Sequence, residues 1–107
     1  MMSMASMQVS IQPFAKGWIQ NHLVIMFYIY LLKSTSTGRF YIGYTQDLKR
    51  RWSEHSQGKV YSTRRFTPWK LVYYEAYPNK AQAQLREKKL KQYGSSYTGL
   101  LKRLGYK

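Results

Sequence analysis

Three short runs of β-branched and aromatic residues, separated by turn-forming residues, constrain the fold of this chain more than any other feature. Such side chains pack well on a pleated sheet, and runs of this length are typical of buried strands. They predict strands over Phe27–Lys33, Arg39–Tyr44 and Trp69–Tyr77, and segment 34–38 predicts the turn of a hairpin. None of the runs reaches the roughly 18 apolar residues of a membrane-spanning helix, so we expect no such span.

Helices are predicted between and after these strands. Residues 45–47 supply N-cap candidates for a helix of about eleven residues that ends before Gly58. Asn79 can cap a second helix that runs to Tyr93, and residues 97–104 form a short last helix. The predicted order is ββαβαα. We therefore expect an α+β domain in which a three-stranded antiparallel sheet is flanked by helices.

The length of 107 residues fits one domain, and an apolar content of 44% supports a small core. We place the domain at residues 26–105, where the pattern is dense. Residues 1–25 contain one cation, Lys16, and no acid, and they have the pattern of neither a signal peptide nor a mitochondrial presequence. We interpret them as a poorly ordered N-terminal extension, and we expect a cytoplasmic protein.

Charge and cysteine content narrow the function classes. Eighteen Lys and Arg against four Asp and Glu give a net charge of +14, which indicates a polyanionic partner, nucleic acid first and an anionic membrane second. No predicted helix joins a strongly apolar face to a basic one, so we expect no membrane partner. The absence of cysteine excludes disulfide scaffolds, thiol catalysis and iron–sulfur clusters. Four carboxylates are too few for a carboxylate-rich two-metal site.

Tyrosines in the predicted hairpin are the first candidate site residues. Strand alternation places Tyr28, Tyr30 and Leu32 on one face of the sheet. Antiparallel pairing brings Tyr41 close to Tyr30 if the turn is centred near residues 35–37. These rings either form a functional pair or pack across the strands, as tyrosines commonly do.

The first predicted helix carries a pair of candidate phosphate-binding residues. Arg51 and His55 are four residues apart, so they project from the same face. A guanidinium can hold two phosphate oxygens, and an imidazole exchanges a proton near neutral pH. The alternative is a solvated basic face together with Lys49 and Arg50. We also expect Arg50 and Glu54 to form a surface ion pair.

Glu87 is the candidate metal ligand. It is the only acid of its basic helix, and helical spacing places it on one stripe with Ala83 and Leu90, toward the sheet. A carboxylate in that position needs a partner, because an unpaired buried charge is costly. The partner is either an arginine or a metal ion that also binds a substrate phosphate, as Mg²⁺ does through one or two carboxylates.

Cations, hydroxyls and aromatic rings alternate in the predicted loop between the first helix and the third strand. This composition is typical of a nucleic-acid contact surface, where cations engage phosphates and rings stack on exposed bases. The alternative is a basic loop without a target. The candidate nucleic-acid-binding residues are Lys59, Arg64, Arg65 and Lys70.

Two tyrosine-containing strand motifs and three helical residues occur in an order typical of one family. They are Tyr28-Ile29-Tyr30, Tyr41-Ile42-Gly43, Arg51, His55 and Glu87. Together they resemble the GIY-YIG nuclease superfamily, in particular its small single-domain bacterial members. The resemblance covers residues 26–105. It implies a GIY-YIG-like nuclease domain, a metal-dependent phosphodiesterase that cuts a DNA strand and leaves a 5′-phosphate and a 3′-hydroxyl.

The resemblance also implies roles for individual residues. Tyr30 or Tyr41 is similar to the base that activates the attacking water, and Arg51 to the residue that holds the scissile phosphate. His55 corresponds to a residue that assists proton transfer or fixes the tyrosine pair. Glu87 is similar to the ligand of one divalent cation, Mg²⁺ or Mn²⁺. Arg51 and the cation would lower the pKa of a phenol, which is otherwise about 10.

We therefore expect an endonuclease that acts on DNA, is directed by structure or damage, and has weak sequence preference. The basic helices and the loop over 59–70 would read the substrate, or a protein partner would supply targeting. Two alternatives stay open: RNA as the substrate, and a non-catalytic nucleic-acid-binding module that keeps the fold. The sequence predicts no oligomeric state.

Overall fold

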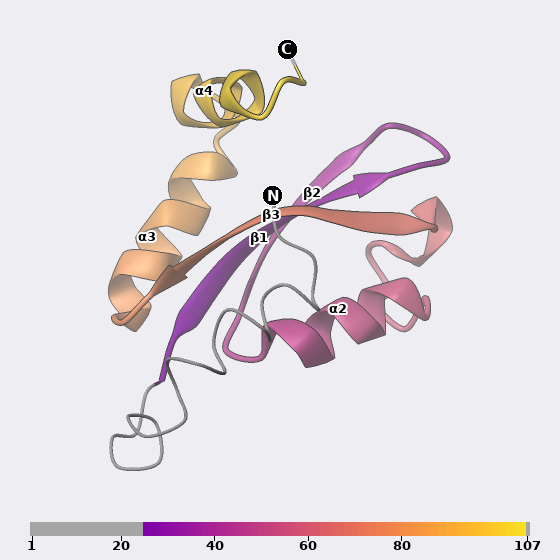
Figure 1. The fold of residues 1–107 in the computed structure, drawn as a ribbon, viewed down its shortest axis with the longest axis horizontal. Helices are drawn as coiled ribbons and strands as arrows, with labels where there is room; N and C mark the ends of the chain where they lie inside the picture. Colours follow the sequence, from indigo (N-terminus) through magenta and orange to yellow (C-terminus); the bar gives the residue numbers. More distant parts are fainter. Residues whose placement is uncertain (1–24, 107) are drawn as a thin grey trace, which may run out of the picture.

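The computed structural model describes residues 25–106, and its architecture is the predicted α+β arrangement. Three strands, β1 (Phe27–Ser34), β2 (Phe40–Thr45) and β3 (Trp69–Tyr77), form one sheet in the order β2-β1-β3 (Figure 1). Both outer strands pair with β1 in antiparallel orientation, as predicted. The predicted N-terminal extension lies, apart from residue 25, outside the described residues.

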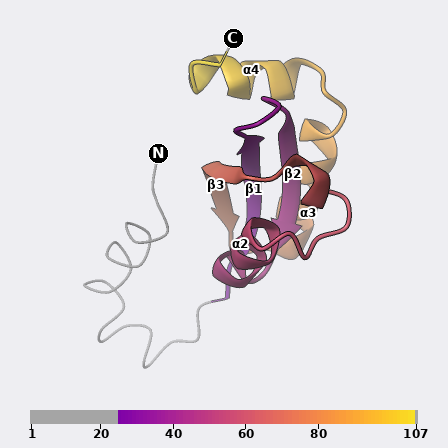
Figure 2. The same cartoon turned by 90° about the vertical axis from the view of Figure 1, so that its right-hand side faces the viewer.

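Helices cover both faces of the sheet. α2 (Leu48–Ser56) lies on one face, whereas α3 (Lys80–Leu90) and α4 (Ser95–Arg103) lie on the other (Figures 1 and 2). A short 3₁₀ helix, η1 (Arg64–Phe66), interrupts the loop between α2 and β3. The predicted order ββαβαα is confirmed, with η1 as an addition and with α4 starting at 95 rather than at 97. Within residues 25–106, no helix is both long enough and apolar enough to cross a membrane.

The helix ends follow local side-chain chemistry. The Asp47 carboxylate accepts a hydrogen bond from the Arg50 amide, so it caps α2 at the predicted place. Asn79 caps α3 in the same way. However, α3 ends at Leu90 and not at the predicted Tyr93. Tyr93 adopts a left-handed backbone conformation, with φ of 55°, and a helix does not continue through such a residue.

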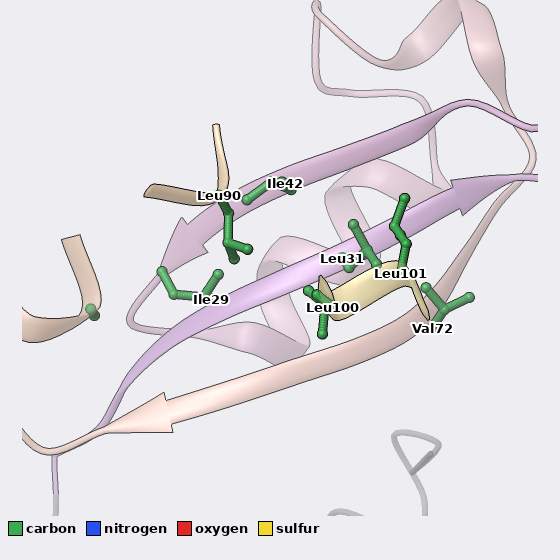
Figure 3. Packing of buried hydrophobic residues seen from close by; sticks show 8 residues of the cluster. Ile29, Leu31, Ile42, Val72, Leu90, Leu100 and Leu101 are labelled. Atoms are coloured by element: carbon green, nitrogen blue, oxygen red, sulfur yellow. The ribbon is translucent and has the colours of Figure 1, made fainter. Parts of the chain in front are cut away.

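Alternation along β1 divides its side chains between two cores. Ile29 and Leu31 point toward α3 and α4 (Figure 3), whereas Tyr30 and Leu32 point toward α2. All four are almost fully buried. The buried core on the α2 side contains two aromatic residues with polar atoms, whereas the buried core on the other side is aliphatic. The core on the α2 side consists of Tyr30, Leu32, Leu48 and Trp69. The core on the α3 and α4 side consists of Ile29, Leu31, Ile42, Val72, Ala83, Leu90, Leu100 and Leu101.

A partly buried ion pair fixes α3 against the sheet. The Arg86 guanidinium of α3 donates hydrogen bonds of 2.9, 3.0 and 3.2 Å to the Glu75 carboxylate of β3. The hydroxyls of Tyr73 and Tyr77 donate further bonds of 2.6 Å each. Burial raises the pKa of Glu75, but these donors outweigh burial and hold the pKa below its usual value. This network, which no sequence pattern predicted, sets the position of α3 and thereby of Glu87.

Gly43→Ala is expected to disturb the core on the α2 side. Gly43 lies on β2 opposite Tyr30, and a Cβ at this position would overlap the Tyr30 ring. The ring would have to leave its buried position, and overpacking of this kind costs about 1–3 kcal/mol. Urea unfolding measures the loss in the free energy of unfolding.

Gly99→Ala is the matched control for this experiment. Gly99 lies within α4 and has open space around the position of a Cβ. Alanine should stabilise the helix there by up to about 1 kcal/mol. If the two variants unfold at the same urea concentration, the Tyr30 ring does not depend on the absence of a side chain at position 43.

Candidate active site

Two tyrosines and a histidine meet on the α2 side of the sheet. In the strand register Tyr30 faces Gly43 and Leu32 faces Tyr41, so Tyr30 and Tyr41 are diagonal neighbours on one face. Their ring centroids lie 6.3 Å apart. The His55 ring from α2 lies 5.6 Å from the Tyr30 ring and 5.1 Å from the Tyr41 ring. The structure therefore brings these three predicted site residues together.

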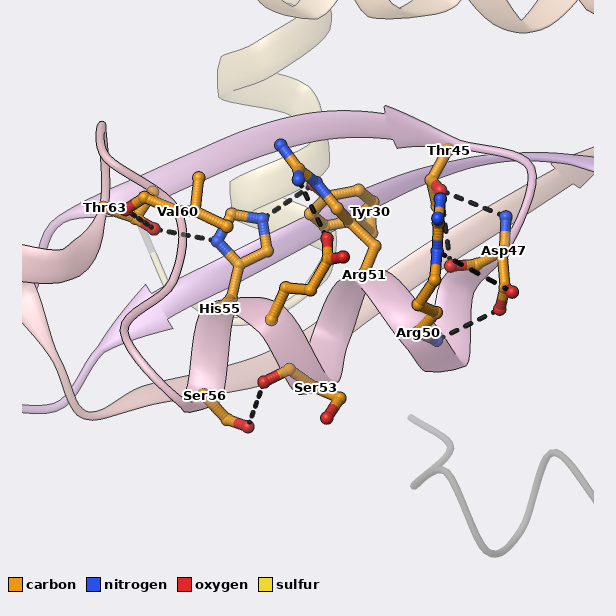
Figure 4. A network of polar contacts seen from close by, with 11 residues as sticks. Tyr30, Thr45, Asp47, Arg50, Arg51, Ser53, His55, Ser56, Val60 and Thr63 are labelled. Atoms are coloured by element: carbon orange, nitrogen blue, oxygen red, sulfur yellow. Dashed lines mark hydrogen bonds and ion pairs between the residues drawn. The ribbon is translucent and has the colours of Figure 1, made fainter.

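The Tyr30 ring passes over Gly43 and ends in a hydrogen bond. Its hydroxyl lies 2.8 Å from His55 Nε2 (Figure 4), and both side chains are almost completely buried. Burial raises the pKa of Tyr30 well above that of a free phenol, although a hydrogen bond with Arg51 acts in the opposite direction. Tyr30 is therefore neutral near pH 7 and has a proton to donate.

Thr63 determines which nitrogen of His55 carries the proton. The Thr63 hydroxyl lies 2.8 Å from His55 Nδ1 and donates its own proton to the Val60 carbonyl, 3.5 Å away. We assign the Nδ1–H tautomer, in which Thr63 accepts from His55 Nδ1 and Nε2 accepts from the Tyr30 hydroxyl. Burial, and after it the charge of Arg51, lower the pKa of His55 to about 4. The ring is thus neutral near pH 7.

Arg51 is the cation of the site. Its guanidinium lies 3.0 Å from the Glu54 carboxylate, and it is close enough to Tyr30 to lower the pKa of that phenol against the larger effect of burial. The Arg51 side chain is 34% exposed, so a ligand can reach it. The expected ion pair of Arg50 with Glu54 is wrong, because Glu54 turns to Arg51 and Arg50 lies 3.9 Å from Asp47. Pairs three residues apart also meet on a helix, which allows both contacts.

Glu87 of α3 lies within electrostatic reach of the site. Burial is the main cause of the raised pKa of Tyr30, but the charge of Glu87 contributes to it. The expected partner of Glu87 was an arginine or a metal ion; its carboxylate lies 3.1 Å from the ammonium of Lys91. Among residues 25–106, no three His, Asp or Glu side chains form a metal-binding group. A single carboxylate fits a Mg²⁺ ion that keeps most of its waters and shares phosphate oxygens.

Two of the four predicted nucleic-acid-binding residues lie in a cluster of cations and rings. The Arg64 guanidinium lies 4.7 Å from the centre of the Tyr61 ring, and the Arg65 guanidinium lies 5.2 Å from that of Phe66. Arg64, Arg65 and Tyr61 are exposed. Because Thr63 belongs to the same loop, this cluster lies next to the histidine of the site.

The other two predicted contacts lie elsewhere. Lys59 lines a hollow along α2, together with Arg50 and Glu54. Lys70 of β3 lies opposite Lys33 in the sheet, so both point to the face that α3 and α4 cover. A nucleic-acid strand bound along the α2 side would therefore contact Arg64 and Arg65, whereas Lys70 points to the other face of the sheet.

Thr63 and Trp69 belong to the site although neither was predicted as a site residue. The Trp69 indole donates a hydrogen bond of 2.8 Å to the Thr63 carbonyl and so holds the backbone that presents the Thr63 hydroxyl. The only signal in the sequence is a pair of hydroxyl residues in the loop after the helix. Which hydroxyl reaches the histidine depends on the path of the loop, and local pattern does not determine that path.

The comparison with known families defines the class of this protein. The profile of the family described as GIY-YIG catalytic domain matches residues 26–100. This segment contains the whole sheet, α2, α3 and every side chain of the site. The protein therefore belongs to the GIY-YIG catalytic domain family, a family of nuclease domains, and the predicted resemblance is confirmed.

Several relatives carry the name UPF0213. The chain is 44% identical over 66 residues to a UPF0213 protein of Streptococcus agalactiae, which covers 61% of this chain and 74% of that protein. It is 38% identical over 68 residues to a UPF0213 protein of Halobacterium salinarum, and the match covers 63% of this chain and 87% of that protein. The match to the solution structure of a UPF0213 protein from Bacillus halodurans covers 75% of this chain and 85% of that protein's chain, with 33% sequence identity and a TM-score of 0.48. None of these names states an activity.

Thr63→Val is expected to let the ring proton of His55 occupy either nitrogen. Valine has the shape of threonine without the hydroxyl, so His55 Nδ1–H loses its acceptor and the ring populates both tautomers. Tautomer-sensitive ¹⁵N NMR shifts measure the change. The chain has two histidines, so His22→Gln serves as the background that assigns the signal. An unchanged Nδ1–H tautomer in Thr63→Val would contradict the role given to Thr63.

The low pKa of His55 also predicts a pH dependence of stability. Between the unfolded value of 6.5 and the folded value of about 4, the unfolded chain binds more protons. The free energy of unfolding therefore falls as the pH decreases through this window, by about 3 kcal/mol in total. Above about pH 5 we attribute the fall to His55, because an imidazole in the unfolded chain takes up its proton in this range. Urea unfolding between about pH 5 and pH 7 should give a flat profile in His55→Gln; a wild-type slope in that variant over the same range would refute this origin.

Proposed function

We propose that this protein is a divalent-metal-dependent endonuclease that hydrolyses phosphodiester bonds in DNA, directed by structure or damage rather than by sequence. Membership of a nuclease-domain family supports the class. The observation that carries the proposal is the buried chain Tyr30–His55–Thr63 beside the Arg51 guanidinium. A phenol joined to a neutral imidazole can pass on a proton, and a guanidinium can hold a phosphate next to it.

In this proposal Arg51 binds the scissile phosphate. Glu54 occupies one nitrogen of the guanidinium, at 3.0 Å, and the partly exposed side chain has further N–H donors for phosphate oxygens. Arg64 and Arg65 add sequence-independent attraction to the strand on either side. The phosphate would then lie near the Tyr30 hydroxyl, because Arg51 is close enough to Tyr30 to act on its pKa.

Tyr30 is the better candidate for the base than Tyr41, because Tyr30 holds the hydrogen bond to His55. The phenol oxygen accepts a proton from the attacking water while its own proton moves to His55 Nε2, which Thr63 keeps free to accept. The water oxygen bonds to phosphorus, and the bond to the 3′ oxygen breaks. The leaving oxygen takes a proton from solvent, so the products are a 5′-phosphate and a 3′-hydroxyl.

A bound Mg²⁺ or Mn²⁺ would neutralise the charge that develops on the phosphate and on the leaving oxygen. Glu87 is the residue that would hold it. Its pair with Lys91 is a partly exposed contact between side chains four residues apart, and such pairs contribute only about 0.3–0.5 kcal/mol. A cation could therefore take the place of the lysine at little cost.

One observation favours a second function, that of a non-catalytic nucleic-acid-binding module. In the free protein the pKa of Tyr30 is raised and that of His55 is lowered, so neither group is a strong base near pH 7. A binding module would keep the charge and the basic loop without needing proton transfer. The +14 net charge attracts polyanions without selecting among them, so the proposal includes a protein partner that directs the protein to its substrate. The proposal also includes a cytoplasmic location.

Glu87→Gln is expected to abolish cleavage and to preserve binding. The substitution keeps the size of the side chain and removes the charge that a cation needs. We expect cleavage of nicked, flapped, duplex or single-stranded DNA to fall at least about 100-fold in Mg²⁺ or Mn²⁺. Binding in EDTA, followed by fluorescence anisotropy, should stay within about twofold, because Glu87 makes no phosphate contact without a cation and one charge among many contributes little.

Lys91→Gln is the matched control. It removes the same ion pair from the other side and leaves the carboxylate in place. If Glu87 serves only the ion pair, the two variants lose activity alike, and the metal role is refuted. If the wild-type protein binds every substrate but cuts none in either metal, the binding module replaces the enzyme. Cleavage of RNA alone would correct the substrate.

A further inference from the structure

A hollow of about 280 Å³ lies beside the site and is separate from the residues that hold the phosphate. It shares Tyr41 with the tyrosine pair and Thr63 with the histidine chain, so the two places are contiguous. The volume is slightly below the roughly 300–1,000 Å³ of pockets for drug-sized ligands, so it has room for one flat ring system.

The walls of this hollow are aromatic and held in place. The Trp69 ring meets the Phe66 ring at 6.5 Å and the Tyr41 ring at 6.4 Å, both edge to face. Trp69 cannot turn easily, because it is buried and its indole N–H is bonded to the Thr63 carbonyl. The hollow is therefore a fixed feature of the fold.

Tyr93 also lines the hollow, and both its exposure and its backbone conformation are unusual for a large aromatic residue. Tyr93 is 59% exposed although it lines the hollow, and the Tyr97 ring meets the Tyr93 ring edge to face at 5.0 Å. Its backbone has a φ of 55°, a conformation that suits glycine and asparagine but not a bulky residue. The fold of an isolated domain does not require a large ring at this exposed, strained position. A ligand that stacks on the ring would give it a function.

The rim of the hollow is positively charged. The Arg39 guanidinium lies 4.5 Å from the centre of the Phe66 ring, and that of Arg65 lies 5.2 Å from the same ring. Both arginines are exposed. Aromatic walls with a cationic rim fit a flat ring that is linked to phosphates, which is the chemistry of a nucleotide within a strand.

We propose that this hollow binds one unpaired nucleobase of the strand whose phosphate lies at Arg51, stacked against Tyr93 and the Phe66–Trp69 wall. The placement next to the scissile phosphate rests on the proposed function. A base inside a duplex is stacked and paired, so it cannot enter a pocket unless it is unpaired or flipped out. The hollow thus selects strands with free bases, such as single strands, flaps or damaged sites.

Binding of three ligands in EDTA tests this proposal. They are a short single-stranded DNA, an abasic strand of the same length and charge, and the corresponding duplex. The strand with bases should bind the wild-type protein about tenfold more tightly than the abasic strand, since stacking of one base on aromatic side chains gives an effect of that order. Equal affinities would overturn the proposal.

Two variants test whether the preference for a strand with bases arises in this hollow. Tyr93→Asn removes the ring and keeps a residue that tolerates the left-handed backbone. Phe66→Leu removes an aromatic wall and keeps an apolar side chain. Both should bring the ratio of affinities close to one and leave binding of the abasic strand unchanged. Leu85→Asn is the control, because Leu85 is an exposed apolar residue of α3 outside the hollow. If the tenfold ratio persists in both ring variants, or falls equally in Leu85→Asn, the hollow is not the base site.

The result is independent of cleavage. If the nuclease proposal fails, the preference for free bases still appears in EDTA. If the base preference fails, the Glu87→Gln experiment is unaffected. The same ratio measured on an RNA strand would support a pocket that reads the base and not the sugar.

Discussion

The buried hydrogen bond between Tyr30 and His55 is the constraint on which the α2 side of the molecule depends. Two polar groups that leave water must be satisfied inside, because an unpaired donor or acceptor costs about 1–3 kcal/mol. Tyr30 reaches His55 because Gly43 has no side chain to block the ring. His55 keeps an accepting nitrogen because Thr63 takes the other proton. Two strands, a helix and a loop are therefore held in one arrangement by a single chain of donors and acceptors.

The four carboxylates of this very basic chain each have a separate partner. Asp47 caps α2, Glu54 holds the guanidinium of the site, and Glu75 anchors α3 to the sheet. Among residues 25–106, the ion-pair partner of Glu87 is an ammonium four residues away, on a side chain that is itself 44% exposed. A chain with so few acids can still bind a phosphate, because Arg51 and the arginines of the basic loop supply positive charge beside the site. One carboxylate would then suffice for one cation.

Features that depend on local geometry could be predicted from the sequence, and those that depend on packing could not. Strand alternation placed Tyr30 and Tyr41 on one face, and helical spacing placed Arg51 beside His55. The role of Thr63 depends on the path of a loop whose direction is set by the tryptophan that follows it. The pairing of Glu75 with Arg86 and the aromatic hollow arise only when elements distant in sequence meet. The residues of the site could therefore be named in advance, but not the contacts that orient them.

Binding of a phosphate would change the proton balance of this site. After burial, the charge of Arg51 is the second cause of the low pKa of His55. A phosphate on Arg51 offsets that charge, so the imidazole becomes a better acceptor when the phenol of Tyr30 has to release its proton. The same guanidinium disfavours a proton on His55 in the free protein and does so less once a phosphate is bound. The raised pKa of Tyr30 and the lowered pKa of His55 in the free protein are therefore compatible with catalysis, provided that the strand is held in place while the proton moves.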